Sequence, residues 1–194
     1  MTTFNNIKRG AQRGFALGEM LLAVALVAVL VGIGAAVYSS VRGGISADDA
    51  AAKAIALASD IQKNWRNAGT FASVSAAEAN KLGLIQKPLK FDGTTLTDAW
   101  GNTMSLNGGT NSFALTIGGT ANALSKDNCA AIANRLANGV ATNINIGATA
   151  AVGTGANLGN VTGGNAFKTG STINQANLAT GCNEANPVIA ASFR

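Results

Sequence analysis

The chain has 194 residues, enough for one membrane-associated helix and one folded domain. Charged residues make up only 12% of it, well below the share in typical soluble domains, while glycine occurs 24 times. There is no histidine and a single pair of cysteines, which excludes catalytic triads, Cys–His dyads and the usual zinc sites. The net charge of +5 does not indicate nucleic-acid binding, because the basic residues are scattered and aromatic residues amount to 5%. We therefore expect neither an enzyme nor a cofactor-binding protein.

A basic segment without acidic residues precedes a long apolar run at the N-terminus. Three basic side chains lie within residues 8–13, and residues 20–38 contain no charged, amide or proline residue. Together with residues 15–18, this run is long enough to cross a hydrocarbon layer about 30 Å thick. One carboxylate, Glu19, stands at the start of the run, where an unpaired charge costs about 2.5–3.5 kcal/mol on insertion scales. Glu19 therefore needs a partner.

The motif GFALGE at residues 14–19 resembles the N-terminus of a type IV pilin precursor. The resemblance implies that a prepilin peptidase cuts between Gly14 and Phe15 and methylates the new amino group of Phe15. It also implies that Glu19, the fifth residue of the mature chain, pairs with the α-amino group of its own or an adjacent subunit. Such a pair would fix the axial register between subunits, because pairing offsets desolvation only when the geometry is good.

This interpretation divides the chain into three parts. Residues 1–14 are the leader, residues 15–67 form a long helix, and residues 68–194 form a globular head. Within the helix, residues 15–42 would lie in the inner membrane before assembly and in the filament core afterwards, while residues 45–67 would be amphipathic. Basic residues beside a membrane span stay on the cytoplasmic side, so the head is expected in the periplasm and finally outside the cell.

Two other interpretations of the N-terminus remain open. An ordinary secretory signal peptide would be cut after Gly34-Ala35-Ala36, but the apolar run is longer than the usual 7–15 residues and Glu19 interrupts its beginning. A plain single-pass anchor leaves Glu19 without a role. The secretory alternative predicts a secreted binding domain that forms no filament.

The helix is expected to resume its pattern after Gly43-Gly44, where we expect a bend. Ser46 is followed by two acidic residues, which is a good N-terminal signal for a helix. Apolar residues then recur at three- and four-residue steps, which predicts one buried face. They are Ala51, Ile55, Ala58, Ile61 and Trp65.

The first part of the head is predicted to contain a short helix and a small antiparallel sheet. Residues 74–84 fit the helix, with a capping-box arrangement from Ser75 to Glu78. Turn signals then separate four extended segments, which are residues 89–91, 94–97, 103–106 and 112–117. Asp98-Ala99-Trp100-Gly101-Asn102 resembles the Asp-Pro-Trp-Gly-Asn turn of pilins and pseudopilins, with alanine in place of the proline, and we assign it a structural role.

The C-terminal part is predicted to be tied together by a disulfide. Cys129 and Cys182 both lie in the part expected outside the cytoplasm, where an even number of cysteines indicates a bridge worth about 4 kcal/mol. Cys129 falls in an amphipathic helix over residues 125–138. Residues 140–146 and 187–193 are candidate strands, and residues 147–164, which lack periodicity, are expected to form a long exposed loop. A pilin would carry such a bridge around a variable outer surface.

The resemblance implies an α+β fold of the type IV pilin kind and a structural role in a pilus. The leader of intermediate length, the mature chain of residues 15–194 and the wide disulfide loop are most similar to the type IVb branch, whose pili serve adhesion, aggregation or conjugative mating contact. Phe15 as the first mature residue is more similar to the other branch, type IVa. The expected partners are copies of the chain itself, the prepilin peptidase, the assembly machinery and inner-membrane lipid. The alternative is a minor pilin or pseudopilin of a secretion or DNA-uptake system.

Overall fold

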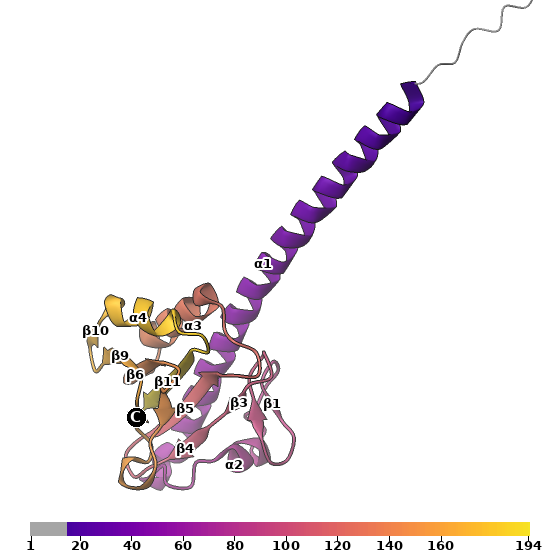
Figure 1. Cartoon of the computed structure of the whole chain (residues 1–194). Helices are drawn as coiled ribbons and strands as arrows, with labels where there is room; N and C mark the ends of the chain where they lie inside the picture. Colours follow the sequence, from indigo (N-terminus) through magenta and orange to yellow (C-terminus); the bar gives the residue numbers. More distant parts are fainter. Residues whose placement is uncertain (1–14) are drawn as a thin grey trace, which may run out of the picture. The chain divides into compact units, whose positions relative to one another are not determined.

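The computed structural model describes the backbone of residues 15–194 and the side chains of residues 20–22, 24–29 and 47–194. The chain forms two compact units, Met1–Arg42 and Gly43–Arg194, and we call the second unit the head. Helix α1 (Phe15–Trp65, 51 residues) contributes to both, and its backbone is helical through Gly43 and Gly44 (Figure 1).

The head is built on a six-stranded antiparallel sheet with the strand order β10-β9-β6-β11-β5-β4. One of the two central strands, β11, is the last strand in the chain, and it pairs with β5 along its whole length and with β6 on the other side. The sheet is therefore complete only when the C-terminal segment inserts between two earlier strands. Its strands are β4 (Leu106–Gly108), β5 (Phe113–Gly118), β6 (Asn143–Gly147), β9 (Asn165–Thr169), β10 (Thr172–Ile173) and β11 (Val188–Phe193).

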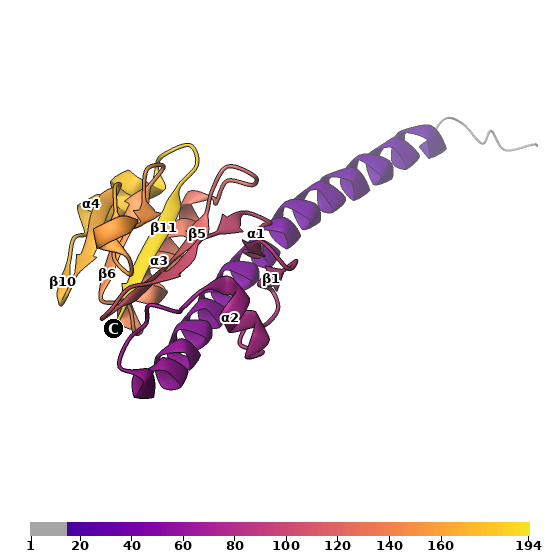
Figure 2. The ribbon, with the colours of Figure 1, turned by 90° about the horizontal axis from the view of Figure 1, so that it is seen from below.

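The second half of α1 is part of the head core and runs along one side of the sheet (Figure 2). Its buried residues follow the predicted stripe, except that Ile55 is only partly buried. Most of the stripe is alanine, and in a close-packed core these buried positions leave little room for larger side chains. The buried residues are Ala47, Ala50, Ala51, Ala54, Leu57, Ala58, Ile61 and Trp65.

The helix ends at Trp65 and is followed by a 3₁₀ turn, η1 (Arg66–Ala68), that closes at Gly69 with φ of 70°. Helix α2 (Ala76–Lys81) is shorter than predicted. Its N-cap is the predicted one, because Ser75 Oγ accepts the backbone N–H of Glu78 at 3.3 Å. In a capping box the Glu78 carboxylate would accept the backbone N–H of Ser75, but here it forms an ion pair with Lys81 at 2.7 Å.

The predicted small sheet is in fact split between two sheets. Strands β1 (Lys90–Phe91), β2 (Leu96–Thr97) and β3 (Thr103–Met104) form a separate three-stranded sheet, whereas β4 and β5 join the large one. The change occurs at Ser105, whose N–H donates to Thr116 Oγ1 at 2.8 Å and whose carbonyl accepts the Thr116 N–H at 3.0 Å. Ser105 thus links the strand that leaves one sheet to the strand that enters the other.

Helix α3 (Lys126–Asn138) matches its prediction. Ser125 caps it by accepting the Asn128 N–H, and its buried face includes Cys129 and Leu136. It lies beside α1, because Arg135 forms an ion pair with Asp48 at 2.7 Å. Helix α4 (Gln175–Cys182) was not predicted, and it packs directly on β6, where a Cβ on Gly181 would lie 2.6 Å from the Ile146 carbonyl oxygen.

The expectation of an irregular loop over residues 147–164 is wrong, although much of the segment, including residues 154–158, is exposed as expected. The segment forms a hairpin of β7 (Ala151–Val152) and β8 (Val161–Thr162) around a 3₁₀ turn, η2 (Gly155–Asn157). Non-local contacts hold it against β4 and the turn that follows β4. The Asn107 side-chain amide donates to the Gly153 carbonyl oxygen at 2.9 Å, and Gly109 lies directly against Leu158.

Replacing Gly109 with alanine should destabilise the head. A Cβ there would lie 2.1 Å from the carbonyl oxygen of Leu158, so the hairpin would have to move away from the sheet. We expect the free energy of unfolding to fall by about 2–3 kcal/mol, measured by urea denaturation with tryptophan fluorescence. Gly83→Ala is the control, since its Cβ meets no atom within 4 Å and only its φ of +68° opposes the change. A loss at Gly109 no larger than the loss at Gly83 would contradict the close packing.

Candidate functional site

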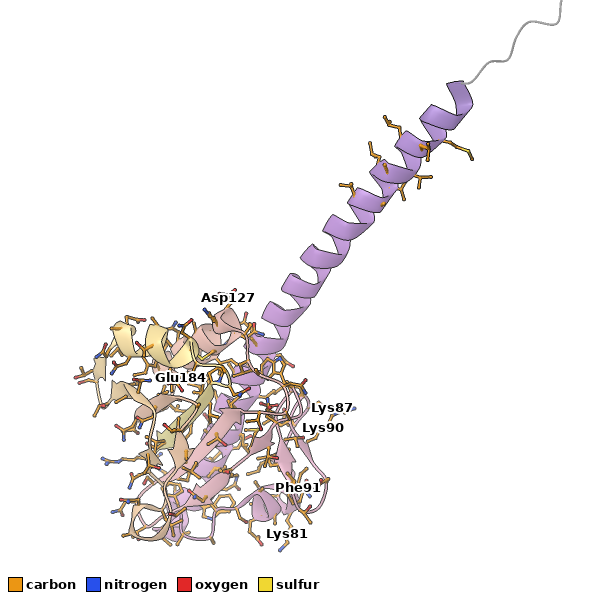
Figure 3. The ribbon with its side chains drawn as sticks, viewed as in Figure 1. Lys81, Lys87, Lys90, Phe91, Asp127 and Glu184 are labelled. Atoms are coloured by element: carbon orange, nitrogen blue, oxygen red, sulfur yellow. A yellow bond between two sulfur atoms is a disulfide. The ribbon has the colours of Figure 1, made fainter. Side chains whose placement is uncertain are left out.

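The surface with the clearest functional meaning is the first part of α1. The large apolar side chains described between residues 20 and 29 are 57–72% exposed (Figure 3). At 100° per residue these positions are distributed around the whole helix rather than along one face. A helix that is apolar on all sides requires lipid or other helices around it. The residues are Met20, Leu21, Leu22, Val24, Leu26, Val27 and Val29.

No helix in the described part of the chain combines the length and the apolarity of a membrane span.

The predicted processing and assembly residues lie at the edge of the described structure. Gly14 is outside the described residues, while Phe15 is the first residue of α1. Glu19 lies in the same helix, and the side chains of both Phe15 and Glu19 are outside the described set. A helical backbone from residue 15 to residue 19 places these two positions one turn apart on the same side. The cleavage, the methylation and the Glu19 pairing stay predictions.

The predicted disulfide is present. Cys129 in α3 and Cys182 at the end of α4 are bonded, with their Cα atoms 5.7 Å apart, and both side chains are buried. The bridge therefore holds the unpredicted helix α4 against α3. The only sequence signal for α4 is its N-cap, Asn174, which accepts the backbone N–H groups of Ala176 and Asn177.

A carboxylate next to the bridge fixes the end of α4 to the sheet. Glu184 accepts the backbone N–H of Ala148 through one oxygen and the Asn165 side-chain amide at 3.3 Å through the other. These bonds join the end of α4 to the turn after β6 and to β9. Sequence analysis missed Glu184, because the segment that it contacts was assigned to an exposed loop.

The turn at residues 98–102 is organised by a buried carboxylate. Asp98 is 2% exposed, and its Oδ1 accepts the backbone N–H groups of Trp100 at 2.9 Å and Asn102 at 2.8 Å. Its Oδ2 accepts the N–H of Gly118 at 2.9 Å and the Asn102 side-chain amide at 3.1 Å. Asp98 thus connects β2 to the end of β5, which agrees with the structural role predicted for this turn.

Asp92 organises an exposed turn in the same way. Backbone N–H groups of Thr95 at 2.7 Å and Thr94 at 2.9 Å, with the Thr94 hydroxyl, donate to its carboxylate and lower its pKa below the ordinary value. Asp92 and Asp98 thus both accept hydrogen bonds from backbone N–H groups of the turns in which they lie. Within residues 20–22, 24–29 and 47–194, no group of three or more acidic or cysteine side chains is arranged to hold a metal ion.

Comparisons with known proteins bear on the fold. No protein-family model matches the sequence, and no curated protein matches it. Among solved structures, TcpA, a type IV pilin from Vibrio cholerae El Tor biotype, is similar with a TM-score of 0.51 and 18% sequence identity. The match covers 77% of this chain and 99% of the TcpA chain. The chain therefore has the type IV pilin fold, and the predicted α+β class with an antiparallel sheet and a C-terminal disulfide is confirmed.

Asp98→Ala should destabilise the head strongly, because it leaves the part-buried N–H group of Trp100 and the buried N–H groups of Asn102 and Gly118 without an acceptor. Each such group costs about 1–3 kcal/mol, so we expect a loss of at least about 3 kcal/mol in urea denaturation. Asp92→Ala is the matched control, since that carboxylate likewise accepts backbone N–H groups, two of them, but is exposed to water, which can replace it. Equal effects of the two substitutions would show that burial of the Asp98 network contributes nothing.

Proposed function

We propose that this protein is the structural subunit of a type IV pilus. The observation that carries the proposal is the apolar surface of α1, which is exposed on all sides between residues 20 and 29. Such a surface is far from what a free domain in water tolerates. In a head with the pilin fold, the simplest cover for it is the same segment of other copies.

In such a filament the apolar helices pack together in a staggered core and the heads form the outer wall. A contact between two different surfaces of successive subunits does not close on itself, and it generates a helix of indefinite length. Before assembly, residues 15–42 lie in the inner membrane with the head on the periplasmic side. The same apolar side chains are then covered first by lipid and later by neighbouring subunits.

The N-terminus supplies the register of assembly under this proposal. A prepilin peptidase removes residues 1–14 and methylates Phe15, whose α-amino group enters an apolar core. Glu19 of the same or an adjacent subunit provides the counter-charge. A carboxylate and an amine in hydrocarbon are stabilised only when they meet, so each subunit stops at the position where they do.

The type IVb branch fits the chain best. Removal of the 14-residue leader leaves residues 15–194, and the Cys129–Cys182 bridge spans 53 positions near the C-terminus. The pilus would serve adhesion, aggregation or conjugative mating contact. Its partners are other copies of the chain and the inner-membrane assembly machinery.

Glu19→Ala should leave membrane insertion intact and reduce filament yield at least tenfold, because the α-amino group then has no counter-charge at the assembled position. Yield is measured by electron microscopy and by the amount of subunit in sheared surface material. Asp49→Ala, which removes an exposed carboxylate of the same helix inside the head, serves as the control and should assemble normally.

Normal filaments from Glu19→Ala would contradict the register argument while leaving the pilus itself in place. Absence of filaments from the unsubstituted chain would contradict the proposed function.

A further inference from the structure

A cleft of about 760 Å³ lies in the head at the C-terminal end of α1. It is formed where the last turns of α1, the segment after η1 and the end of β11 come together. The Gln62 side-chain amide donates a hydrogen bond to the Arg194 carbonyl oxygen, which joins residues 132 positions apart. Figure 2 shows the C-terminal end of the chain near the last turns of α1.

The cleft is cationic. Lys63, Arg66 and Arg194 line it and are exposed, and no acidic residue is among the residues that line it. The ion pairs found among residues with described side chains use Lys81 and Arg135, so these three cations have no carboxylate within 4 Å in that part of the chain. The α-carboxylate of Arg194, which accepts the Gln62 amide, offsets one of the three positive charges, and the remaining positive excess around the hollow attracts an anion.

Helix stabilisation explains only part of this arrangement. Cations in the last turn of a helix interact favourably with its negative end, and that accounts for Lys63 and Arg66. Arg194 follows β11 and belongs to no helix. Its presence in the same cleft points to a ligand rather than to a helix cap.

The remaining lining groups indicate what kind of anion the cleft suits. Asn67, Asn111, Thr70 and Thr110 are also among the residues that line it, and side chains of these types can both donate and accept hydrogen bonds. The volume is far larger than a single oxyanion needs and is typical of sites for small organic molecules. We propose that this cleft binds an anionic saccharide, with Lys63, Arg66 and Arg194 on its carboxylate or sulfate and the amides and hydroxyls on its sugar hydroxyls.

The test is isothermal titration calorimetry of the full chain in mild detergent. The probes are a sulfated heparin disaccharide, a hyaluronan tetrasaccharide, lactose, sodium sulfate and a thymidine oligonucleotide. We expect at least one of the two acidic sugars to bind, lactose not to bind, and sulfate to bind at least tenfold more weakly than the acidic sugar. The comparison of the first two probes distinguishes a sulfated source from a carboxylated one.

Arg66→Gln and Arg194→Gln should each weaken that binding about tenfold, which is the usual effect of removing one charged hydrogen-bond donor. Lys87→Gln is the charge-matched control, because Lys87 is exposed and lies outside the cleft on the part of the head labelled in Figure 3. It should change binding less than twofold.

Three results would overturn the proposal. These are sulfate binding as tightly as the sugars, a thymidine oligonucleotide binding more tightly than them, and loss of binding in Lys87→Gln equal to that in Arg66→Gln. The cleft belongs to the head alone, so each of these results can be obtained whether or not the chain forms filaments.

Discussion

The arrangement of the head depends on the contact between α1 and the rest of the core. The helix presents a stripe of small side chains, and Ala51, Ala54 and Ala58 are completely buried in it. Larger residues there would push the helix away from the sheet. The same helix carries bulky apolar side chains on all sides between residues 20 and 29, and these side chains are exposed. The second half of α1 therefore packs into the head, whereas the apolar surface of its first part requires lipid or other helices around it.

Close backbone packing, rather than ion pairing, holds the head together. The two ion pairs among the described side chains, Lys81–Glu78 and Arg135–Asp48, are exposed, and such pairs contribute little. Glycines instead let backbone meet backbone, as where Gly108 faces Phe71. The buried Asp98 network and a disulfide worth about 4 kcal/mol add to this packing. This explains how a chain with so few charges can keep a uniquely folded head.

The sequence predicted the features that local pattern determines. The stripe on α1 follows from periodicity, and the starts of α2 and α3 follow from Ser75 and Ser125, because a cap needs only its own neighbours. The β7–β8 hairpin was missed because its residues have no periodicity and are held by distant groups such as Asn107. The place of β11 between β5 and β6 is likewise non-local. The cationic cleft could not be predicted either, because Arg194 comes close to the end of α1 only when β11 takes its place in the sheet.

The central claim is that α1 becomes the core of a filament after removal of the leader, and the mass of the mature chain tests it most directly. Mass spectrometry of sheared surface filaments should give residues 15–194 with one methyl group on Phe15 and an intact Cys129–Cys182 bridge. A chain that begins at Val37 would lack the apolar segment and would contradict the account. So would a chain that still begins at Met1.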